Sequence, residues 1–359
     1  MSVRAELLAW YGAHRRDLPW RRTGDPYAIW VSEVMLQQTQ VAAVLPYFER
    51  FLARFPTPAA LAEADEDAVL AAWSGLGYYR RVRHLREGAR QVVARHRGAV
   101  PEDLASLRAL PGIGAYTAGA IASIAFGREE PVLDGNVRRV LARWTADAGE
   151  GGDARFWALA RTLVTGPRPG DWNQALMELG ATVCTPKDPD CARCPVRARC
   201  RAHATGTPER FPRARPRKPS RTVRVEVALI EHDGAVLLER GGTGGPLRGK
   251  WDLPAAEAGG EALAGEALRA ALRERHGIDV VPGPLGRPAL HTILDRRLRL
   301  CVIRCAWPQR GRQRGMEPGA GLRWMVAEAL DATPVSGATR KVLRANLVRA
   351  TSSAGGRAL

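Results

Sequence analysis

The sequence lacks an apolar run long enough to cross a membrane, and it has far fewer acidic than basic residues. Among 359 residues, 54 are Lys or Arg against 37 Asp or Glu, so the formal net charge is +17. A membrane-spanning helix needs about 20 predominantly apolar residues, and no segment approaches that length. The first residues, Met1-Ser-Val-Arg-Ala-Glu6, carry charge before any apolar stretch. We therefore expect no secretory signal, no membrane attachment and a cytoplasmic, nucleoid-associated location.

The excess of positive charge is the first indication of a polyanionic partner. Phosphate groups attract such a surface, and their neutralisation makes binding salt-dependent. Many basic proteins, however, carry their charge on solvated faces, so the charge alone leaves both interpretations open. Hydrophobic residues make up 45% and charged residues 25% of the chain, as in soluble globular proteins, and 359 residues are enough for two domains.

Cysteine is scarce, with six residues, yet four of them lie in one 17-residue window. Intervals of six, two and five residues separate Cys184, Cys191, Cys194 and Cys200. Thiols this close in a reducing compartment are more often ligands than disulfides. Zinc sites usually pair two C-x2-C knuckles, and only Cys191 and Cys194 form one, so the unequal spacing favours a [4Fe–4S] cluster. A disulfide or a zinc loop is the alternative.

Changes in composition divide the chain. Residues 1–204 have helical patterning, with the cysteine window, 184–200, at their end. Residues 205–221 hold four prolines and six basic residues, which predicts a stiff cationic linker, either along DNA phosphates or in solvent. Residues 222–347 have strand-like alternation mixed with helix, and 348–359 should be a disordered tail. We predict an all-α domain followed by an α+β domain.

Three helices of the first domain can be placed. Asp25-Pro26 supplies an N-cap and a proline at the first position of a helix that runs toward Gln37. A second helix begins near Tyr78, and Asp171 caps a third, from Trp172 to about Val183. The second helix has an apolar stripe of Val82, Leu85, Ala89, Val92 and Val93, with Arg80, Arg81, Arg83, Arg86 and Arg90 mostly outside it.

The second domain begins with two predicted strands, Thr222–Glu231 and Ala235–Glu239, joined by a His-Asp-Gly turn. A helix follows at about Glu261–His276 and ends at Gly277. Leu298–Ala306 is a further predicted strand.

The segment Leu110-Pro-Gly-Ile-Gly-Ala-Tyr-Thr-Ala-Gly119 lies between two predicted helices. Gly112 and Gly114 permit a tight turn with outward amides, and the next helix offers its positive end, so together they would hold a phosphate without reading sequence. An ordinary glycine turn is the plainer alternative. The whole string, together with the later cysteine window, resembles the helix-hairpin-helix and cluster loop of the endonuclease III superfamily of DNA glycosylases.

Two carboxyl groups are candidates for catalysis. Asp134, in Pro131-Val-Leu-Asp-Gly-Asn-Val-Arg-Arg139, precedes a predicted helix, where backbone amides and the helix dipole would keep it ionised. A purely structural N-cap is the alternative. Glu33, in Trp30-Val-Ser-Glu-Val-Met-Leu-Gln-Gln-Thr-Gln-Val41, has apolar neighbours, and burial would raise its pKa and keep it protonated. A helical Glu by itself is more often solvated or ion-paired.

The string around Glu33 resembles the MutY family of adenine glycosylases, and the resemblance covers essentially all of residues 1–204. It implies that Glu33 protonates the adenine ring, while Asp134, with Tyr116 and Asn136, stabilises the cationic sugar. Bifunctional members of the superfamily carry a Lys at position 116, whose amine attacks the sugar. Tyr116 therefore predicts hydrolysis without efficient strand cleavage.

The same resemblance assigns contacts to the extruded adenine and to DNA. Base extrusion costs roughly a few kcal/mol, which inserted side chains partly offset by restacking. The implied adenine pocket consists of Arg16, Trp20, Arg21, Leu36 and Glu178. The implied DNA contacts are Gln37, Gln38, Thr39, Tyr78, Gly112 and Gly114, with His291, Thr292 and Ile293 in the second domain.

Residues 222–345 or so resemble the Nudix-like domain of these enzymes, in which 8-oxoguanine is recognised. Aligned on Gly277, an active Nudix box would place Arg-Glu at 270–271 and paired acids at 274–275. The chain instead has Ala270, Ala271, Glu274 and Arg275. One carboxylate is too few to hold a catalytic cation, so the resemblance implies a domain that binds rather than cleaves.

The expected lesion-reading loop departs from the family pattern. A Phe-Ser-His loop should fall within Ala289–Leu298, yet Ile293, Leu294 and Asp295 follow His291-Thr292. Because the hydrogen-bonding Ser and His are missing there, we expect discrimination of 8-oxoguanine from guanine to be weaker or to be made elsewhere.

Together these patterns predict an adenine glycosylase that acts as a monomer on double-stranded DNA and hydrolyses adenine opposite 8-oxoguanine or guanine. Two alternatives remain: a bifunctional pyrimidine glycosylase/lyase like endonuclease III, and a non-catalytic lesion-binding protein. The first would form a Schiff base, which Tyr116 cannot. The joint presence of Glu33 and Asp134 disfavours the second.

Overall fold

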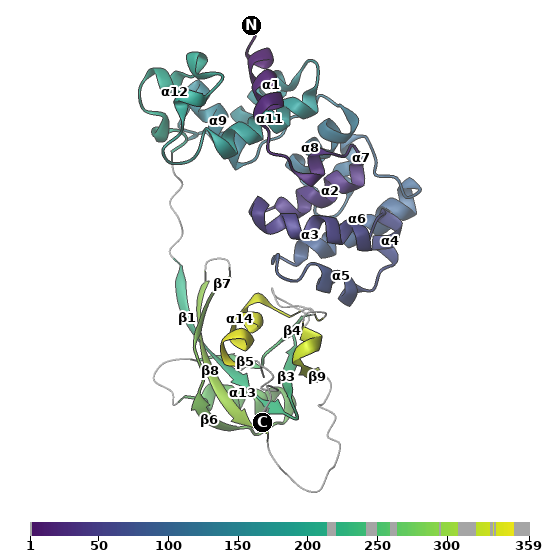
Figure 1. Cartoon of the computed structure of the whole chain (residues 1–359), viewed down its shortest axis with the longest axis vertical. Helices are drawn as coiled ribbons and strands as arrows, with labels where there is room; N and C mark the ends of the chain where they lie inside the picture. Colours follow the sequence, from purple (N-terminus) through teal and green to yellow (C-terminus); the bar gives the residue numbers. More distant parts are fainter. Residues whose placement is uncertain are drawn as a thin grey trace, which may run out of the picture. The chain divides into compact units, whose positions relative to one another are not determined.

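The computed structural model describes residues 2–213, 220–241, 250–258, 264–293, 296–307, 321–330, 333 and 335–347. The chain forms two compact units, coloured along the sequence in Figure 1. One unit is Met1–Ala64 with Arg80–Pro216, and the other is Asp65–Tyr79 with Arg217–Leu359. A short piece of the helical sequence thus belongs to the second unit.

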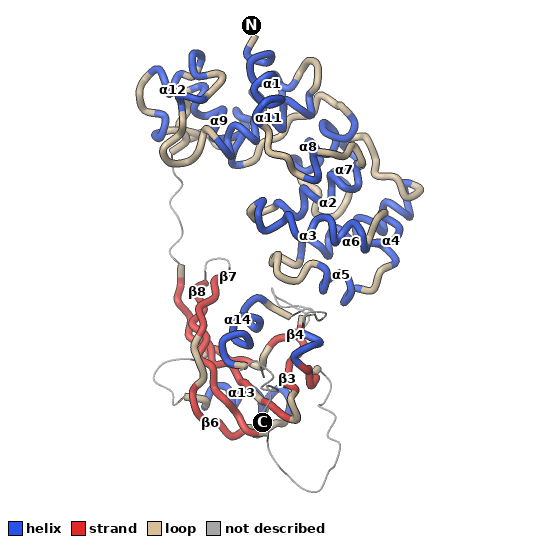
Figure 2. The backbone as a smooth tube through the Cα atoms, in the orientation of Figure 1, coloured by secondary structure: helices blue, strands red, loops and turns tan. Residues whose placement is uncertain are grey.

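The first unit is helical and shows no strand among its described residues (Figure 2), which confirms the predicted all-α domain. Its α-helices are α1 (Val3–His14), α2 (Pro26–Leu36), α3 (Val41–Arg54), α4 (Pro58–Glu63), α6 (Arg80–His96), α7 (Leu104–Ala109), α8 (Ala115–Phe126), α9 (Gly135–Thr145), α10 (Ala154–Val164), α11 (Pro169–Thr182) and α12 (Arg201–Ala204). Short 3-10 helices lie at Pro19–Arg21, Cys191–Arg193, Arg197–Arg199 and Pro208–Arg210. No helix in the described part of the chain combines the length and the apolar character that a membrane span requires.

Helix α2 begins as the sequence predicts. The Asp25 carboxylate accepts hydrogen bonds from the amides of Tyr27 and Ala28, and Pro26 occupies the first helical position. Every residue from Tyr27 to Met35 is buried, because α2 packs against α3, α6 and α8. A helix without a solvent face is a core element, so polar residues on it are buried as well.

Helix α6 differs from its prediction at two positions. It begins at Arg80 because Gly77 and Tyr78 have φ of +71° and +47°, outside the helical region. Val93 was expected on the buried stripe, but it is 39% exposed while Val92 is fully buried. Adjacent helical residues lie about 100° apart around the axis, so the two valines cannot both face the core.

The prediction that Asp171 caps α11 is wrong. The helix starts at Pro169, its N-cap position is Arg168 with left-handed backbone, and Asp171 lies within the first turn. There the Asp171 carboxylate pairs with the Arg168 guanidinium at 2.7 Å.

The expected linker is partly ordered against the helical unit. Residues 208–210 form a 3-10 helix, Arg143 Nε donates to the carbonyl of Phe211 at 3.0 Å, and the amide of Arg213 donates to Ala148 at 3.0 Å. Proline does not prevent this, because a 3-10 turn accepts proline at its start. Residues 214–219 and the predicted tail, 348–359, lie outside the described residues.

The second unit is α+β, as predicted (Figure 2). One sheet has the order β5-β1-β8-β6, with β7 also paired to β8, and the other has the order β2-β3-β4, with β9 paired to β3. Its strands are β1 (Arg221–Leu229), β2 (Glu231–His232), β3 (Ala235–Arg240), β4 (Trp251–Asp252), β5 (Ala255–Glu257), β6 (Val281–Leu285), β7 (Ala289–Ile293), β8 (Arg296–Ala306) and β9 (Leu322–Val326). Its helices are α5 (Glu66–Ala72), α13 (Glu266–His276), α14 (Gly337–Asn346) and a 3-10 turn at Ala327–Leu330.

Strand β1 does not alternate throughout as predicted for Thr222–Glu231. Its last residues and the residue after them, Val227, Ala228, Leu229 and Ile230, are all buried. The strand is central, parallel to β8 and antiparallel to β5, and both of its faces are covered. Val227 and Leu229 share a core cluster with residues of α14, while Ala228 and Ile230 share another with residues of α13.

Helix α13 ends at Gly277, whose φ is +67°, as the sequence predicts. It begins at Glu266 rather than near Glu261, and residues 261–263 lie outside the described part. Gly265 precedes it with φ of +95°, and a Cβ there would lie 2.7 Å from Pro282 Cβ, so the helix starts at a point where only glycine fits.

Candidate active site

Helix α2 carries Glu33 into the interior of the first unit. Only 5% of the residue is exposed. Burial raises its pKa, the Tyr116 hydroxyl and the Arg21 guanidinium lower it, and the Asp134 carboxylate raises it again, so that the pKa lies at about 7. Glu33 Oε2 is buried without a hydrogen-bond partner among the described residues. The prediction of a buried, protonatable carboxyl is confirmed.

Asp134 is the N-cap of α9. Its Oδ1 accepts a hydrogen bond of 2.7 Å from the amide of Val137, and its Oδ2 accepts one of 2.8 Å from Asn136 Nδ2. Burial raises the pKa of Asp134, and the hydrogen bonds from Val137 and Asn136 lower it without cancelling the shift. The predicted capping hydrogen bonds, which favour the ionised form, are present, whereas the burial that raises the pKa of the carboxyl was not predicted.

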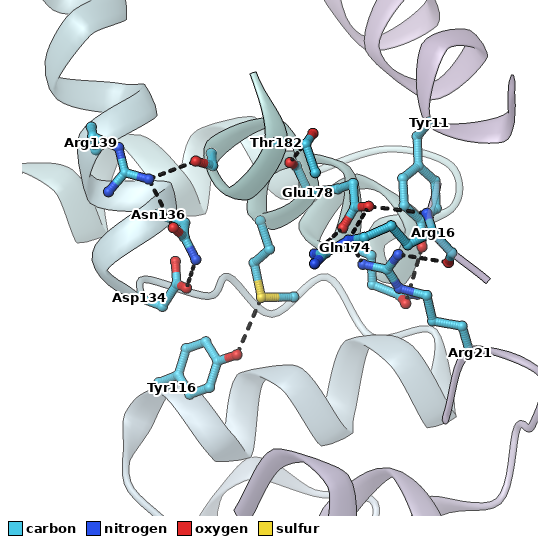
Figure 3. A network of polar contacts seen from close by, with 12 residues as sticks. Tyr11, Arg16, Arg21, Tyr116, Asp134, Asn136, Arg139, Gln174, Glu178 and Thr182 are labelled. Atoms are coloured by element: carbon cyan, nitrogen blue, oxygen red, sulfur yellow. Dashed lines mark hydrogen bonds and ion pairs between the residues drawn. The ribbon is translucent and has the colours of Figure 1, made fainter. Parts of the chain in front are cut away.

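Tyr116, on α8, joins the two carboxyl groups electrostatically. Burial, the charge of Glu33 and the charge of Asp134 all raise its pKa well above the usual value. Its hydroxyl also donates to Met177 Sδ at 3.2 Å (Figure 3). The structure thus brings together Glu33, Tyr116 and Asp134, which lie on α2, on α8 and at the start of α9.

Arg139, on α9, connects Asn136 to α11, and the sequence patterns did not single it out. Its Nη2 donates to Asn136 Oδ1 at 2.8 Å (Figure 3) and to the carbonyl of Gly180 at 2.6 Å. Its Nε donates to the carbonyl of Cys184 at 2.7 Å. The close approach of α9 and α11 requires glycine at 180, where a Cβ would lie 2.7 Å from Asn136 Cβ. That glycine was the one sequence signal that could have located the contact.

Arg16, Arg21 and Glu178 of the expected adenine pocket form one ion-pair network (Figure 3). Glu178 is fully buried; its Oε1 accepts from Arg16 N at 3.0 Å and Nε at 2.8 Å, and its Oε2 accepts from Nη2 of Arg16 and of Arg21, each at 2.8 Å. Burial alone would raise the pKa of Glu178, but the two guanidinium groups outweigh it and lower the pKa to about 2. The carboxylate is therefore engaged with both arginines.

Glu178→Gln is expected to destabilise the protein by about 3 kcal/mol, because it leaves the largely buried Arg21 guanidinium, and that of the half-exposed Arg16, without their counter-charge. The measurement is thermal and urea unfolding of the full chain. Asp17→Asn is the matched control, since Asp17 pairs with Arg22 at the surface, where such pairs contribute at most about 1 kcal/mol. Equal unfolding midpoints for the two variants would contradict a structural role for Glu178.

Of the other two pocket residues, Trp20 directly precedes Arg21 of this network, and Leu36 lies at the end of α2. Trp20 is buried in the 3-10 helix Pro19–Arg21 and packs edge-on against Phe48, with ring centroids 5.4 Å apart. Leu36 is half-buried and is the last residue of α2, one turn after Glu33. Arg21 connects the groups, because it binds Glu178 and also lowers the pKa of Glu33.

The predicted hairpin is confirmed as α7, a tight turn and α8. Gly112 has φ of +78°, and a Cβ there would lie 2.8 Å from His84 Cβ, so both its backbone and its contact with α6 require glycine. Gly114 is the N-cap of α8 with extended backbone, and nothing lies within 4 Å of the position of its Cβ. The backbone conformation therefore requires glycine at position 112 but not at position 114.

Two predicted DNA contacts have strained backbones. Gln38, just after α2, has φ of +56°, and Tyr78, in the second unit, has φ of +47° with 47% of its surface exposed. Left-handed backbone in residues other than glycine costs about 1–2 kcal/mol and is kept where function or tertiary contacts require it. Thr39 follows Gln38, and Gln37 Nε2 donates to Thr117 Oγ1 at 3.4 Å.

The four cysteines of the window line one small cavity, together with Val183, Arg143 and Arg197. All four are free thiols, and Arg143 Nη1 donates to Cys184 Sγ at 3.3 Å and to the carbonyl of Thr185 at 2.7 Å. Among the residues that the structure describes, no group of three or more His, Cys, Asp or Glu side chains is placed to hold a metal ion. The thiols thus surround a space and do not converge on a point.

The Nudix positions in α13 have no acidic cluster. Glu274 is exposed, and Arg275 Nε pairs with Glu239 Oε1 at 2.8 Å, where His276 Nε2 also lies at 2.8 Å. The Glu239 carboxylate at the end of this helix is therefore already paired with the Arg275 guanidinium and in contact with His276.

The predicted lesion-reading residues lie on β7. Thr292 is exposed, Ile293 is half-buried, and His291 Nδ1 is buried without a hydrogen-bond partner among the described residues. Burial lowers the pKa of His291, and the charges of Lys341 and Lys250 lower it further. Leu294 and Asp295 lie outside the described residues.

Comparison with known proteins assigns both units. Residues 31–155 match the family described as "HhH-GPD superfamily base excision DNA repair protein", and residues 226–345 match the NUDIX domain. The chain is 38% identical to the adenine DNA glycosylase of Homo sapiens over 408 residues, which cover 96% of this chain and 73% of that protein. It is 47% identical over 198 residues to the adenine DNA glycosylase of Mycobacterium tuberculosis (strain ATCC 25618 / H37Rv), covering 53% of this chain and 64% of that protein.

Among solved structures, a thermostable thymine-DNA glycosylase matches 56% of this chain and 95% of its own, with a TM-score of 0.53 and 30% identity. Fold, hairpin and these matches define a base excision DNA repair glycosylase of the helix-hairpin-helix superfamily with a C-terminal NUDIX domain. The chain belongs to the adenine DNA glycosylase family, whose members are N-glycosylases of DNA. Of the functions that the sequence left open, adenine glycosylase is the one confirmed.

Proposed function

We propose that this adenine DNA glycosylase hydrolyses the N-glycosidic bond of adenine paired with 8-oxoguanine or guanine in duplex DNA, as a monomer and without strand cleavage. Glu33 is the acid for the base, and Asp134 is the anion for the sugar. One observation carries the assignment: the buried Glu33, whose pKa is raised to about 7, interacts electrostatically with Asp134, the N-cap of α9.

Each group performs a step that its surroundings favour. Once the adenine is extruded, neutral Glu33 donates a proton to the purine ring, and the bond between the base and C1′ breaks with its electron pair leaving on the base. Positive charge then develops on the sugar, and ionised Asp134, oriented by Asn136, stabilises it. Water adds to C1′ and loses a proton, so the products are free adenine and an abasic site.

Tyr116 distinguishes hydrolysis from lyase chemistry. Its hydroxyl interacts with both carboxyl groups. A hydroxyl cannot form a Schiff base with the sugar, because that reaction requires an amine. We propose that Tyr116 keeps the two charges apart and borders the sugar, in the place where bifunctional relatives use a lysine.

Arg16, Arg21 and Glu178 have a scaffolding role in this proposal. Because all four hydrogen bonds at Glu178 go to the two arginines, the carboxylate orients them beside the extruded base. Trp20 and Leu36 then supply apolar surface for the purine.

The NUDIX domain is proposed to read the opposite base without hydrolytic activity. Glu239 is occupied by Arg275 and His276, so little negative charge is left for a cation there. Thr292 and Ile293 offer an exposed hydroxyl and an apolar side chain at the end of β7, beside His291. We propose that residues 1–204 form the catalytic domain and residues 222–347 the reading domain, with the basic segment 205–221 between them.

Cys184, Cys191, Cys194 and Cys200 are proposed to hold a [4Fe–4S] cluster. The supporting observation is that all four cysteines line one cavity, as four thiolate ligands of a single polynuclear group must. When bound, the cluster would stiffen the loop; Arg143 would balance the thiolate charge. Iron and acid-labile sulfide should be lost in Cys194→Ser and kept in Cys301→Ser, whose thiol lies on β8; equal iron in both variants would contradict the assignment.

A panel of duplexes tests the proposed activity. The protein should release adenine from A:8-oxoG and A:G pairs and leave T:G and oxidised-pyrimidine duplexes intact. Strand breaks should appear only after hot alkali, and borohydride should trap no adduct. A trapped adduct, or pyrimidine release, would overturn the monofunctional adenine assignment.

A further inference from the structure

An arginine at the start of α6 reaches the end of α2. Arg81 Nη1 donates to the carbonyls of Val34 and Met35, each at 2.9 Å, and also to that of Gln37. The last four carbonyls of a helix have no partner within it, so each needs one from elsewhere. The carbonyl of Leu36 accepts from the amide of Thr39, and Arg81 donates to two of the other carbonyls. Its positive charge also lies at the negative end of the helix dipole.

The same guanidinium also holds the loop that follows. Nη2 of Arg81 donates to Thr39 Oγ1 at 3.0 Å, while Nη1 binds the carbonyl of Gln37. Gln38, between them, has φ of +56°, a conformation that glutamine adopts only at a cost. Arg81 therefore clamps the chain on both sides of the strained residue.

We propose that Arg81 is a positioning residue for base extrusion: its guanidinium locks the Gln37–Thr39 loop to α2 and so fixes the distance between the DNA-contacting loop and Glu33. This rests on the proposed function, since it takes Gln38 and Thr39 as DNA contacts. Glu33 lies in the last turn of α2, directly before this loop, so a loop held to the end of α2 is also held at a fixed position relative to Glu33. Lysine keeps the charge, but its one ammonium nitrogen cannot take the places of both Nη1 at the helix end and Nη2 at Thr39.

A second arginine of α6 offers a matched control. Arg86 Nη2 donates to the carbonyl of Ala64, just after α4, which is the same kind of helix-end contact. It does not involve the loop after α2. Arg81→Lys and Arg86→Lys thus keep the charge and each remove a guanidinium from one helix end.

The experiment measures extrusion separately from chemistry. In full-length protein carrying Glu33→Gln, a duplex with 2-aminopurine opposite 8-oxoguanine should show a fluorescence rise on binding. Adding Arg81→Lys to this variant should reduce the amplitude or rate of the fluorescence rise at least about tenfold. In protein that retains Glu33, Arg81→Lys should slow single-turnover adenine release by a similar factor. Arg86→Lys should change both by less than about twofold, and all variants should bind undamaged duplex equally at fixed salt.

A double-mutant cycle keeps the proposal testable even where Arg81→Lys is unstable. Thr39→Val removes one acceptor of the clamp and should slow release about threefold, with little further loss when Arg81→Lys is added, because the two changes break one contact. Additive losses, a wild-type rise in Arg81→Lys, or equal slowing by Arg86→Lys would each overturn it. If the Glu33→Gln protein releases adenine, the proposed function fails. That result does not depend on the Arg81 variants, so it is distinguished from a failure of the Arg81 proposal.

Discussion

Glu33→Gln is expected to slow adenine release by about a thousandfold, while the affinity for a duplex containing A:8-oxoG stays within a few-fold of the parent protein. The glutamine keeps the shape of the buried side chain but has no proton to give to the purine. Single-turnover release from A:8-oxoG, with a gel-shift titration alongside, measures both quantities. Turnover within tenfold of the parent would rule out the role as acid.

Glu33→Gln is also expected to change the pH dependence of stability, which checks the raised pKa of Glu33 without measuring activity. Because the pKa of Glu33 is raised to about 7 in the folded protein from 4.5, the native state binds the proton more tightly than the unfolded chain. Stability is therefore lost as pH rises from about 4.5 through 7, by about 3 kcal/mol for this shift. Glu33→Gln should unfold at a higher temperature than the parent at pH 8 and at a similar one at pH 4.

Asp134→Asn is expected to slow release by about a thousandfold as well, because it removes the negative charge that stabilises the developing cationic sugar. Asparagine is as good an N-cap as aspartate, so α9 should remain intact and the loss should be of charge alone. Circular dichroism, unfolding and single-turnover release separate these two effects.

Asp103→Asn is the control for this change. Asp103 caps α7 in the same way, accepting a hydrogen bond of 2.8 Å from the amide of Ser106, and lies away from the two carboxyl groups. It should leave release within about twofold. If Asp134→Asn were no slower than Asp103→Asn, Asp134 would be only a cap.

Local signals in the sequence predicted the parts of the fold and site that local rules control. The proline and aspartate at the start of α2, the glycine turn before α8 and the cap at Asp134 each depend on a few neighbouring residues, and the structure has all three. Burial of Glu33 followed from apolar neighbours in the same helix.

The contacts that long side chains make across the fold could not be predicted this way. Arg81, Arg86 and Arg139 reach carbonyls at the ends of other segments, between 22 and 47 positions away in the sequence. Sequence patterning registers only their charge, and for the first two it predicted only a position outside the apolar stripe of α6. The burial that raises the pKa of Asp134 could not be predicted for a related reason, because it depends on packing by other helices.

The sharpest test of the two-carboxyl mechanism is the pH dependence of single-turnover adenine release from A:8-oxoG between pH 5 and 9. Glu33, with its pKa of about 7, must be protonated, so the rate constant should fall about tenfold per unit above that pH, and Glu33→Gln should show no such fall. A rate that is level from pH 6 to 9 in the parent protein would contradict proton donation by Glu33.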